Sequence, residues 1–225
     1  KSVQTADSTR ATMLLALGSI AYNTPLTALR SPLEAHIVSH IKQAVEKLPQ
    51  SKRVLRECVA HALVNIGEAL GVKDSDMEIS ARDEFLVLMS TWVDEMINTT
   101  KVAEQETLRD VSILSLRASA ALIRIRPAPS FDTIATVVQN ILPLVEISSV
   151  SDEEDVVLPL AEVLKACLCV YPTNAMVQEI LFSSIDKCRL DHWACSTSGY
   201  QRLRSTRLLQ EVMQAFHSFA GVKTD

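Results

Sequence analysis

The chain has 225 residues, of which 48% are hydrophobic, and it carries a formal net charge of −5. That acidic balance argues against a nucleic-acid-binding protein, because such proteins usually carry a basic stripe or patch. Only five glycines occur, and no two are spaced as in the G-x-G or G-x-x-x-x-G-K loops that cradle nucleotide phosphates. Few glycines among many aliphatic residues favour an all-helical protein.

The five cysteines occur at irregular spacing, unlike the even-numbered framework of a disulfide-rich secreted domain. Reduced cysteines fit an intracellular chain, so we expect a cytoplasmic protein. No uncharged apolar run approaches the ~18 residues that a membrane span needs, so membrane contact should be peripheral. The chain begins with Lys1 rather than Met, and we expect it to be part of a longer protein.

The N-terminal half opens with a helix predicted over residues 8–22. Ser31 and Pro32, with Glu34 three residues after the serine, form the pattern of an N-cap with a capping box. Pro49 is expected to end this second helix.

A third predicted helix opens at Ser51, and Gly71 is expected to end it as a C′ glycine. Its predicted buried face recurs at helical spacing: Leu55, Cys58, Val59, Ala62, Leu63, Ile66 and Leu70.

Ser80 is predicted to cap the next helix. The buried face of that helix is Phe85, Leu88, Met89, Trp92, Val93 and Met96. The polar stretch "NTTKVAEQE" leads into another helix, and "RPAPS" breaks the chain after it. The apolar residues of that helix are Leu108, Val111, Leu114, Ala118, Ala121, Leu122 and Ile125.

Four more helices are predicted near residues 131–147, 153–170, 174–187 and 199–219. The final buried stripe is Leu209, Val212, Met213, Phe216 and Ala220. No segment alternates apolar and polar residues as a half-buried strand would, so the sequence indicates nine helices and no sheet.

These helices pair along the chain. The second members begin near residues 52, 106, 153 and 198, so the starts are about 54, 47 and 45 residues apart, the period of HEAT or armadillo arrays. A pair cannot bury its apolar faces alone, so pairs stack into a continuous core. We predict an all-α, right-handed α-solenoid of HEAT-type helical pairs, with about four and a half repeats in a single array over residues 1–225. Its predicted units are 1–24, the second helix of a preceding repeat, and the pairs 31–72, 80–126, 130–171 and 173–221.

Four acids separate two of the apolar helices: Asp152, Glu153, Glu154 and Asp155. Carboxylates at a helix N-terminus interact favourably with its free N–H groups and positive dipole end, so a capping elbow is the simpler interpretation. A partner-binding acidic patch is the alternative.

Arg202, Arg204 and Arg207 form the densest basic cluster. A solvated helix face explains such a cluster, and the alternative is a contact for an acidic partner, a neighbouring repeat or anionic lipid.

No catalytic, cofactor-binding or metal-binding residue is predicted, so the chain is not expected to be an enzyme. His36 and His40 share a helix face, but no glutamate follows His36 as a zincin motif requires. Cys188, His192 and Cys195 offer three ligands, whereas structural zinc usually takes four.

Three segments resemble HEAT units: "LPLVEISSVSDEEDVVLPLAEVLKACL", "ETLRDVSILSLRASAALIRI" and "RECVAHALVNIGEALG". The first has a Leu-Pro helix, an elbow aspartate and a Val- and Ala-rich second helix. It departs from the pattern at Val157, where HEAT units often have arginine.

The order "TMLLALGSIAYNTP … IVSHIKQAV … RECVAHALVNIGEAL … SLRASAALIRI … YQRLRSTRLLQEVMQAF" is similar to the middle of the maestro heat-like repeat family. That resemblance implies a cytosolic protein-binding scaffold at lysosomes or late endosomes. It would be recruited by a Rab-type small GTPase and would remodel membranes by self-assembly, for example in lysosome fission. The alternative is a karyopherin-like transport or assembly adaptor of another HEAT family.

Overall fold

The computed structural model describes residues 2–25, 27–29, 33–46, 48, 52–72, 79–100, 102–148, 154–170 and 175–222. Over these ranges the chain is helical and contains no β-strand, which confirms the predicted all-α class. The chain forms two compact units, residues 1–137 and 138–225. The boundary between them falls inside a helix.

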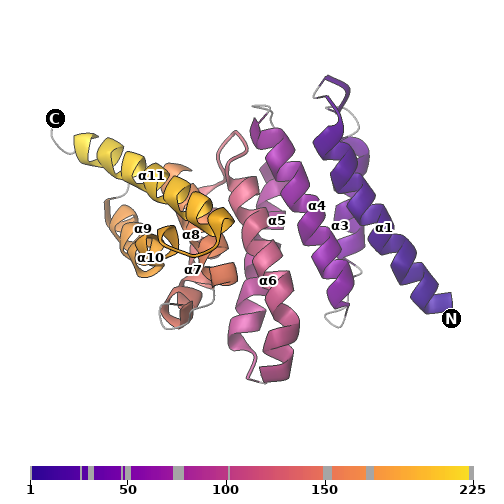
Figure 1. Cartoon of the computed structure of the whole chain (residues 1–225). Coiled ribbons are helices and arrows are strands. Elements are labelled where there is room, and N and C mark those ends of the chain that lie inside the picture. Colours follow the sequence, from indigo (N-terminus) through magenta and orange to yellow (C-terminus); the bar gives the residue numbers. More distant parts are fainter. Residues whose placement is uncertain are drawn as a thin grey trace. The chain divides into compact units, whose positions relative to one another are not determined.

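In the first unit, one helix lies between two others. Helix α4 packs against both α1 and α6, and α6 packs in turn against α5. Figure 1 shows α1, α4 and α6 side by side. The elements of this unit are α1 (Ser2–Asn23), the π-helix η1 (Leu33–Val38), α3 (Ser39–Glu46), α4 (Arg53–Val72), α5 (Ile79–Asn98), α6 (Val102–Ile123) and the first turns of α7 (Phe131–Ser148).

The buried faces of α4, α5 and α6 largely follow the predicted stripes, although Leu108 and Leu114 of α6 are only partly buried. All seven positions predicted for α4 are buried, including Leu63 and Ile66 at 0% exposure. On α5, Leu88 and Met96 are only partly buried, whereas the other four predicted positions are buried. Helix α6 also buries serines that hydrophobic periodicity alone does not identify. The hydroxyls of Ser112 and Ser115 donate to the carbonyls of Leu108 (3.0 Å) and Val111 (2.7 Å) one turn earlier, so their polarity is satisfied inside the helix.

Two glycines set how closely α4 approaches its neighbours. A Cβ on Gly18 of α1 would lie 2.7 Å from the Ala62 Cα, and a Cβ on Gly67 of α4 would lie 2.6 Å from the Ala121 Cβ of α6. Because the atoms met at both contacts include backbone, no rotamer change could relieve them. The helices are therefore held at a separation that only a missing side chain permits.

Several predicted helix ends differ from the structure. Gly71 lies inside α4, which continues to Val72, and no described glycine has a positive φ, so the predicted C′ glycine is wrong. Helix α5 starts at Ile79, which places Ser80 in the first turn rather than at the cap. Helix α6 starts within the polar stretch, at Val102, where Glu104 in its first turn suits the positive end of the dipole.

The predicted helix over 31–48 has two parts. It runs as η1 and then as α3, and nothing in the structure explains why the first part is a π-helix. Ile37 and Ile41 are buried. Ser31, Pro32, Pro49 and Ser51 lie outside the described residues, as does the side chain of Glu34.

A buried arginine anchors the segment that follows α6. Arg82, at 0% exposure, donates to the carbonyl oxygens of Ile125 (3.1 Å) and Pro127 and to the Asp83 carboxylate (3.0 Å). Asp83 in turn accepts from the Ser130 N–H (3.2 Å) and the Thr133 hydroxyl (2.9 Å). Burial raises the pKa of Asp83, but these hydrogen bonds and the Arg82 charge outweigh burial and lower it. The "RPAPS" break is thus tied to α5.

In its described residues, the second unit contains the rest of α7 and four further helices. Helix α8 packs against α9 and α11, and α10 packs against α11. The bounds are α8 (Glu154–Val170), α9 (Ala175–Lys187), α10 (Leu190–Ala194) and α11 (Gly199–Val222). Helix α10 lies where a loop was expected. It follows Arg189, whose φ of 51° is left-handed, and it buries Leu190 and Trp193.

The last predicted stripe is only partly buried. Val212 is buried and Leu209 is partly buried, but Met213 and Phe216 are 48% and 46% exposed, so the prediction is wrong for these two. The side chain of Ala220 lies outside the described residues. Both exposed residues line a groove, whereas periodicity assigns an apolar side chain to a face without indicating whether a neighbour covers it.

The tight contact at Gly67 predicts opposite effects for two glycine substitutions in α4. Gly67→Ala should cost about 1–3 kcal/mol, because the new Cβ meets Ala121 backbone. Gly71→Ala meets no atom within 4 Å and should stabilise by up to ~1 kcal/mol through helix propensity. Urea unfolding of both variants checks the pair. Equal effects would mean that the α4–α6 contact is looser than described.

The Asp83 network predicts a pH-dependent loss of stability. Because the folded pKa is lowered, the stabilisation is fully present above the unfolded value of about 3.9 and is lost as pH falls through the folded pKa. Asp83→Asn should cost roughly 3–5 kcal/mol at pH 7, since it leaves the buried Arg82 charge uncompensated. The difference in the free energy of unfolding between this variant and the wild type should be smaller at pH 3 than at pH 7. The exposed Asp132→Asn is the control. A difference in unfolding free energy that does not change with pH would contradict the lowered pKa of Asp83.

Candidate functional site

Arg204 of the predicted basic cluster is committed to an ion pair. Its Nε donates to Glu162 of α8 at 2.7 Å, and the two side chains are only 15% and 21% exposed. Burial lowers the pKa of Arg204, but the hydrogen bond and charge of Glu162 outweigh burial and raise it. Lys165 of α8 pairs similarly with Glu211 of α11. These two ion pairs, here called the α8–α11 seam, link neighbouring helices.

Arg202 is turned back onto the loop before α11. Its guanidinium donates to the carbonyl oxygens of Ser196 (2.7 Å) and Thr197 (2.9 Å). The same loop is closed by the Ser198 N–H, which donates to the Ser196 hydroxyl at 3.2 Å. Arg202 therefore holds local structure, although its side chain is exposed.

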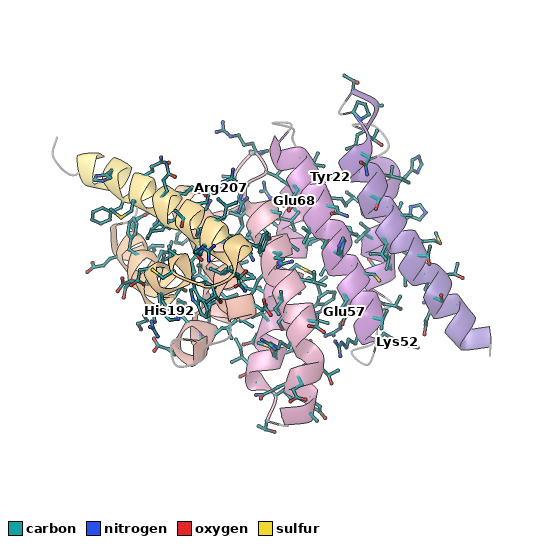
Figure 2. All side chains as sticks on the ribbon, viewed as in Figure 1. Tyr22, Lys52, Glu57, Glu68, His192 and Arg207 are labelled. Carbon is teal, nitrogen blue, oxygen red and sulfur yellow. The ribbon has the colours of Figure 1, made fainter. Side chains whose placement is uncertain are left out.

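Arg207 is the member of the cluster that stays available. Figure 2 marks it on α11, and it is exposed. The side chain of Arg207 forms no hydrogen bond or ion pair with another described residue. The three arginines thus have three different environments, and they do not present the joint patch of free charge that their spacing suggested.

The acidic elbow can be placed only in part. Asp152 and Glu153 lie outside the described residues, as does the side chain of Glu154, which begins α8. Asp155 is exposed in the first turn of α8, and its charge contributes to the raised pKa of Arg204. The structure therefore places Asp155 of the predicted acidic elbow close enough to Arg204 of the basic cluster for their charges to interact.

Neither of two grooves formed by the described residues was predicted. The α4–α6 groove has a volume of about 560 Å³ and is lined by Arg53, Arg56, Asp94, Glu95, Asn98, Thr99, Glu104, Thr107 and Leu108. The α9–α11 groove has a volume of about 410 Å³ and is lined by Phe182, Ser183, Ile185, Asp186, Leu190, Asp191, Leu209, Val212, Met213 and Phe216. Each brings together residues of three helices, which no periodicity within one helix could reveal.

Both basic side chains of the α4–α6 groove are paired with carboxylates. Arg56 is 3% exposed, donates to Glu95 at 2.6 Å, and places its Cζ 5.0 Å from the centroid of the Trp92 ring. Arg53 donates to Glu57 at 2.5 Å and also to Asp110. Such pairs fix helix positions, so we interpret this groove as structural.

The cysteines and histidines show no arrangement for nucleophilic or metal chemistry. Burial raises the pKa of Cys167 and Cys188 to about 12 each, so both thiols stay protonated at neutral pH and are poor nucleophiles. Cys188 is buried whereas His192 and Cys195 are exposed. Within the described part of the chain, no three His, Cys, Asp or Glu residues are placed to hold a metal ion.

The α8–α11 seam predicts different effects for two arginines of the same cluster. Arg204→Met should cost about 1–3 kcal/mol, because it leaves the half-buried Glu162 without its donor. Arg207→Met removes the same charge from an exposed position and should change stability by less than about 0.5 kcal/mol. Thermal unfolding distinguishes them. A Tm that falls equally for both would show that Arg204 is not committed to the seam.

Over the described ranges, no helix combines the length and apolar character required to cross a bilayer. Comparisons with protein-family models, with curated proteins and with solved structures give no match to this chain.

Proposed function

We propose that this chain is a non-enzymatic, protein-binding scaffold segment built as a right-handed α-solenoid of HEAT-type helical pairs. The observation that carries the proposal is stacking in chain order. Helix α4 packs between α1 and α6 in the first unit, and α8 packs against α11 in the second. The second helices of the predicted pairs begin at Arg53, Val102, Glu154 and Gly199, so their starts are 49, 52 and 45 residues apart. Neighbour-to-neighbour stacking at that period is typical of a helical-repeat array.

Exposed apolar side chains support a binding role. The outer helix of the first unit, α1, exposes Met13, Ile20 and Tyr22, each to more than half of its surface. Helix α11 exposes Tyr200 and Leu203 to 70% and 64%. Apolar side chains gathered on surface helices are typical of protein–protein contacts, and a scaffold presents such surfaces without needing reactive groups.

The resemblance to the maestro heat-like repeat family suggests the more specific role. We propose a scaffold on the cytosolic face of lysosomes or late endosomes that acts in membrane remodelling or lysosome fission. Recruitment would depend on a Rab-type small GTPase, because a segment of net charge −5 has little attraction for anionic lipid. Arg207 alone adds about 1 kcal/mol at most to lipid binding.

Vesicle sedimentation tests this role. The purified chain should not pellet with bare anionic vesicles at physiological salt. It should pellet when a member of a Rab-type GTPase panel is anchored to the same vesicles in its GTP-bound form, and GDP loading is the control. Strong pelleting on bare vesicles, abolished by Arg207→Glu, would replace the scaffold proposal with direct lipid binding. Failure with every GTPase would remove the Rab-dependent role.

A further inference from the structure

The α9–α11 groove has an apolar lining that this chain leaves partly uncovered. Phe182 of α9 and Phe216 of α11 meet edge to face, with ring centroids 5.2 Å apart. Phe216 and the neighbouring Met213 nevertheless expose 46% and 48% of their surface. Covering such side chains is favourable in water. The volume of about 410 Å³ lies in the range of binding pockets and admits several side chains.

Two unneutralised carboxylates border this lining. Asp186 near the end of α9 and Asp191 at the start of α10 are exposed, and neither side chain forms an ion pair with another described residue. The nearest cations in sequence do not neutralise them. Lys187 pairs with Glu146, and the exposed Arg189 forms no ion pair with a described residue. An occupant of this groove therefore gains from an apolar face and from positive charge at its edge.

We propose that the α9–α11 groove binds an amphipathic helical segment of a partner protein, with apolar anchors for the groove and Lys or Arg for Asp186 and Asp191. The inference rests on the proposed scaffold function and specifies its partner class. Helix α11 presents Leu209, Met213 and Phe216 at spacings of four and three residues, which form the ridge against which a second helix packs. Helix-in-groove binding of this kind uses anchors at i, i+3 or i+4, and i+7.

A displayed peptide library tests the proposal. Peptides of about 16 residues, long enough to form a helix when bound, are selected for binding to the intact chain. Those that also bind a Met213→Lys chain are discarded. Enriched peptides should carry apolar residues at helical spacing, flanked by Lys or Arg. The affinity of one enriched peptide for each variant is then measured by fluorescence anisotropy.

The variants separate the apolar and the charged parts of the site. Met213→Lys and Phe216→Lys should each weaken binding at least about 30-fold, as expected for central apolar anchors. Asp186→Asn combined with Asp191→Asn should weaken it about 3- to 10-fold and reduce its dependence on salt. Gln210→Lys is the matched control, because it places the same charge at an exposed position of α11 outside the groove and should leave affinity within about twofold. Circular dichroism of each variant confirms that it is folded.

Three results would overturn the proposal. The first is that no peptide binds the intact chain better than the Met213→Lys chain. The second is enrichment of acidic peptides. The third is self-association, seen in sedimentation velocity, that Met213→Lys abolishes. The last result would assign the groove to a second copy of the chain. GTPase-dependent recruitment of the unsubstituted chain to vesicles is measured in parallel. Recruitment without peptide binding rejects the groove alone, whereas peptide binding without recruitment rejects the Rab-dependent role alone.

Discussion

The close approach of α4 to its two neighbours is the contact on which the first unit depends. Gly18 against Ala62 and Gly67 against Ala121 bring backbone to backbone on both sides of one helix. That separation lets the serines of α6, with Ala118, Ala120 and Ala121, be buried and close-packed, where a wider gap would need large side chains to fill it. Two of the scarce glycines, Gly18 and Gly67, are thus placed where the helices approach most closely.

Buried charge has a consistent role in both units. Arg56 with Glu95, Arg82 with Asp83, Lys165 with Glu211 and Arg204 with Glu162 are pairs in which the basic side chain is at most 15% exposed. Three of the four join different helices, and Arg82 also bonds the segment after α6. A buried ion pair adds little net stability but is costly to break, so such pairs favour one alignment of the helices over others. Arg204, which the sequence offers as a contact for partners, is therefore used inside the molecule instead.

Much of the fold could be predicted because helical periodicity is a local property. The seven-residue stripe of α4 is buried as expected, since each position depends mainly on its own helix. The errors concern contacts between elements. Gly71 has the residue type of a helix end, yet α4 passes through it. Phe216 has the periodicity of a core residue, yet nothing in the described part of the chain covers it fully. Arg202, Arg204 and Arg207 look alike in sequence, and only the surrounding helices and loop distinguish them.

The same distinction indicates where a binding role can lie. A side chain already committed within the fold has little free energy to offer a partner, because a new contact must replace an existing one. Arg204, Arg56 and Arg82 are committed in this sense. Met213 and Phe216 are not, because half of their surface still contacts water, and Asp186 and Asp191 lack an intramolecular counter-ion among the described residues. In an acidic helical protein, apolar grooves with free carboxylates at the edge are thus better suited to recognise partners than its most basic segment.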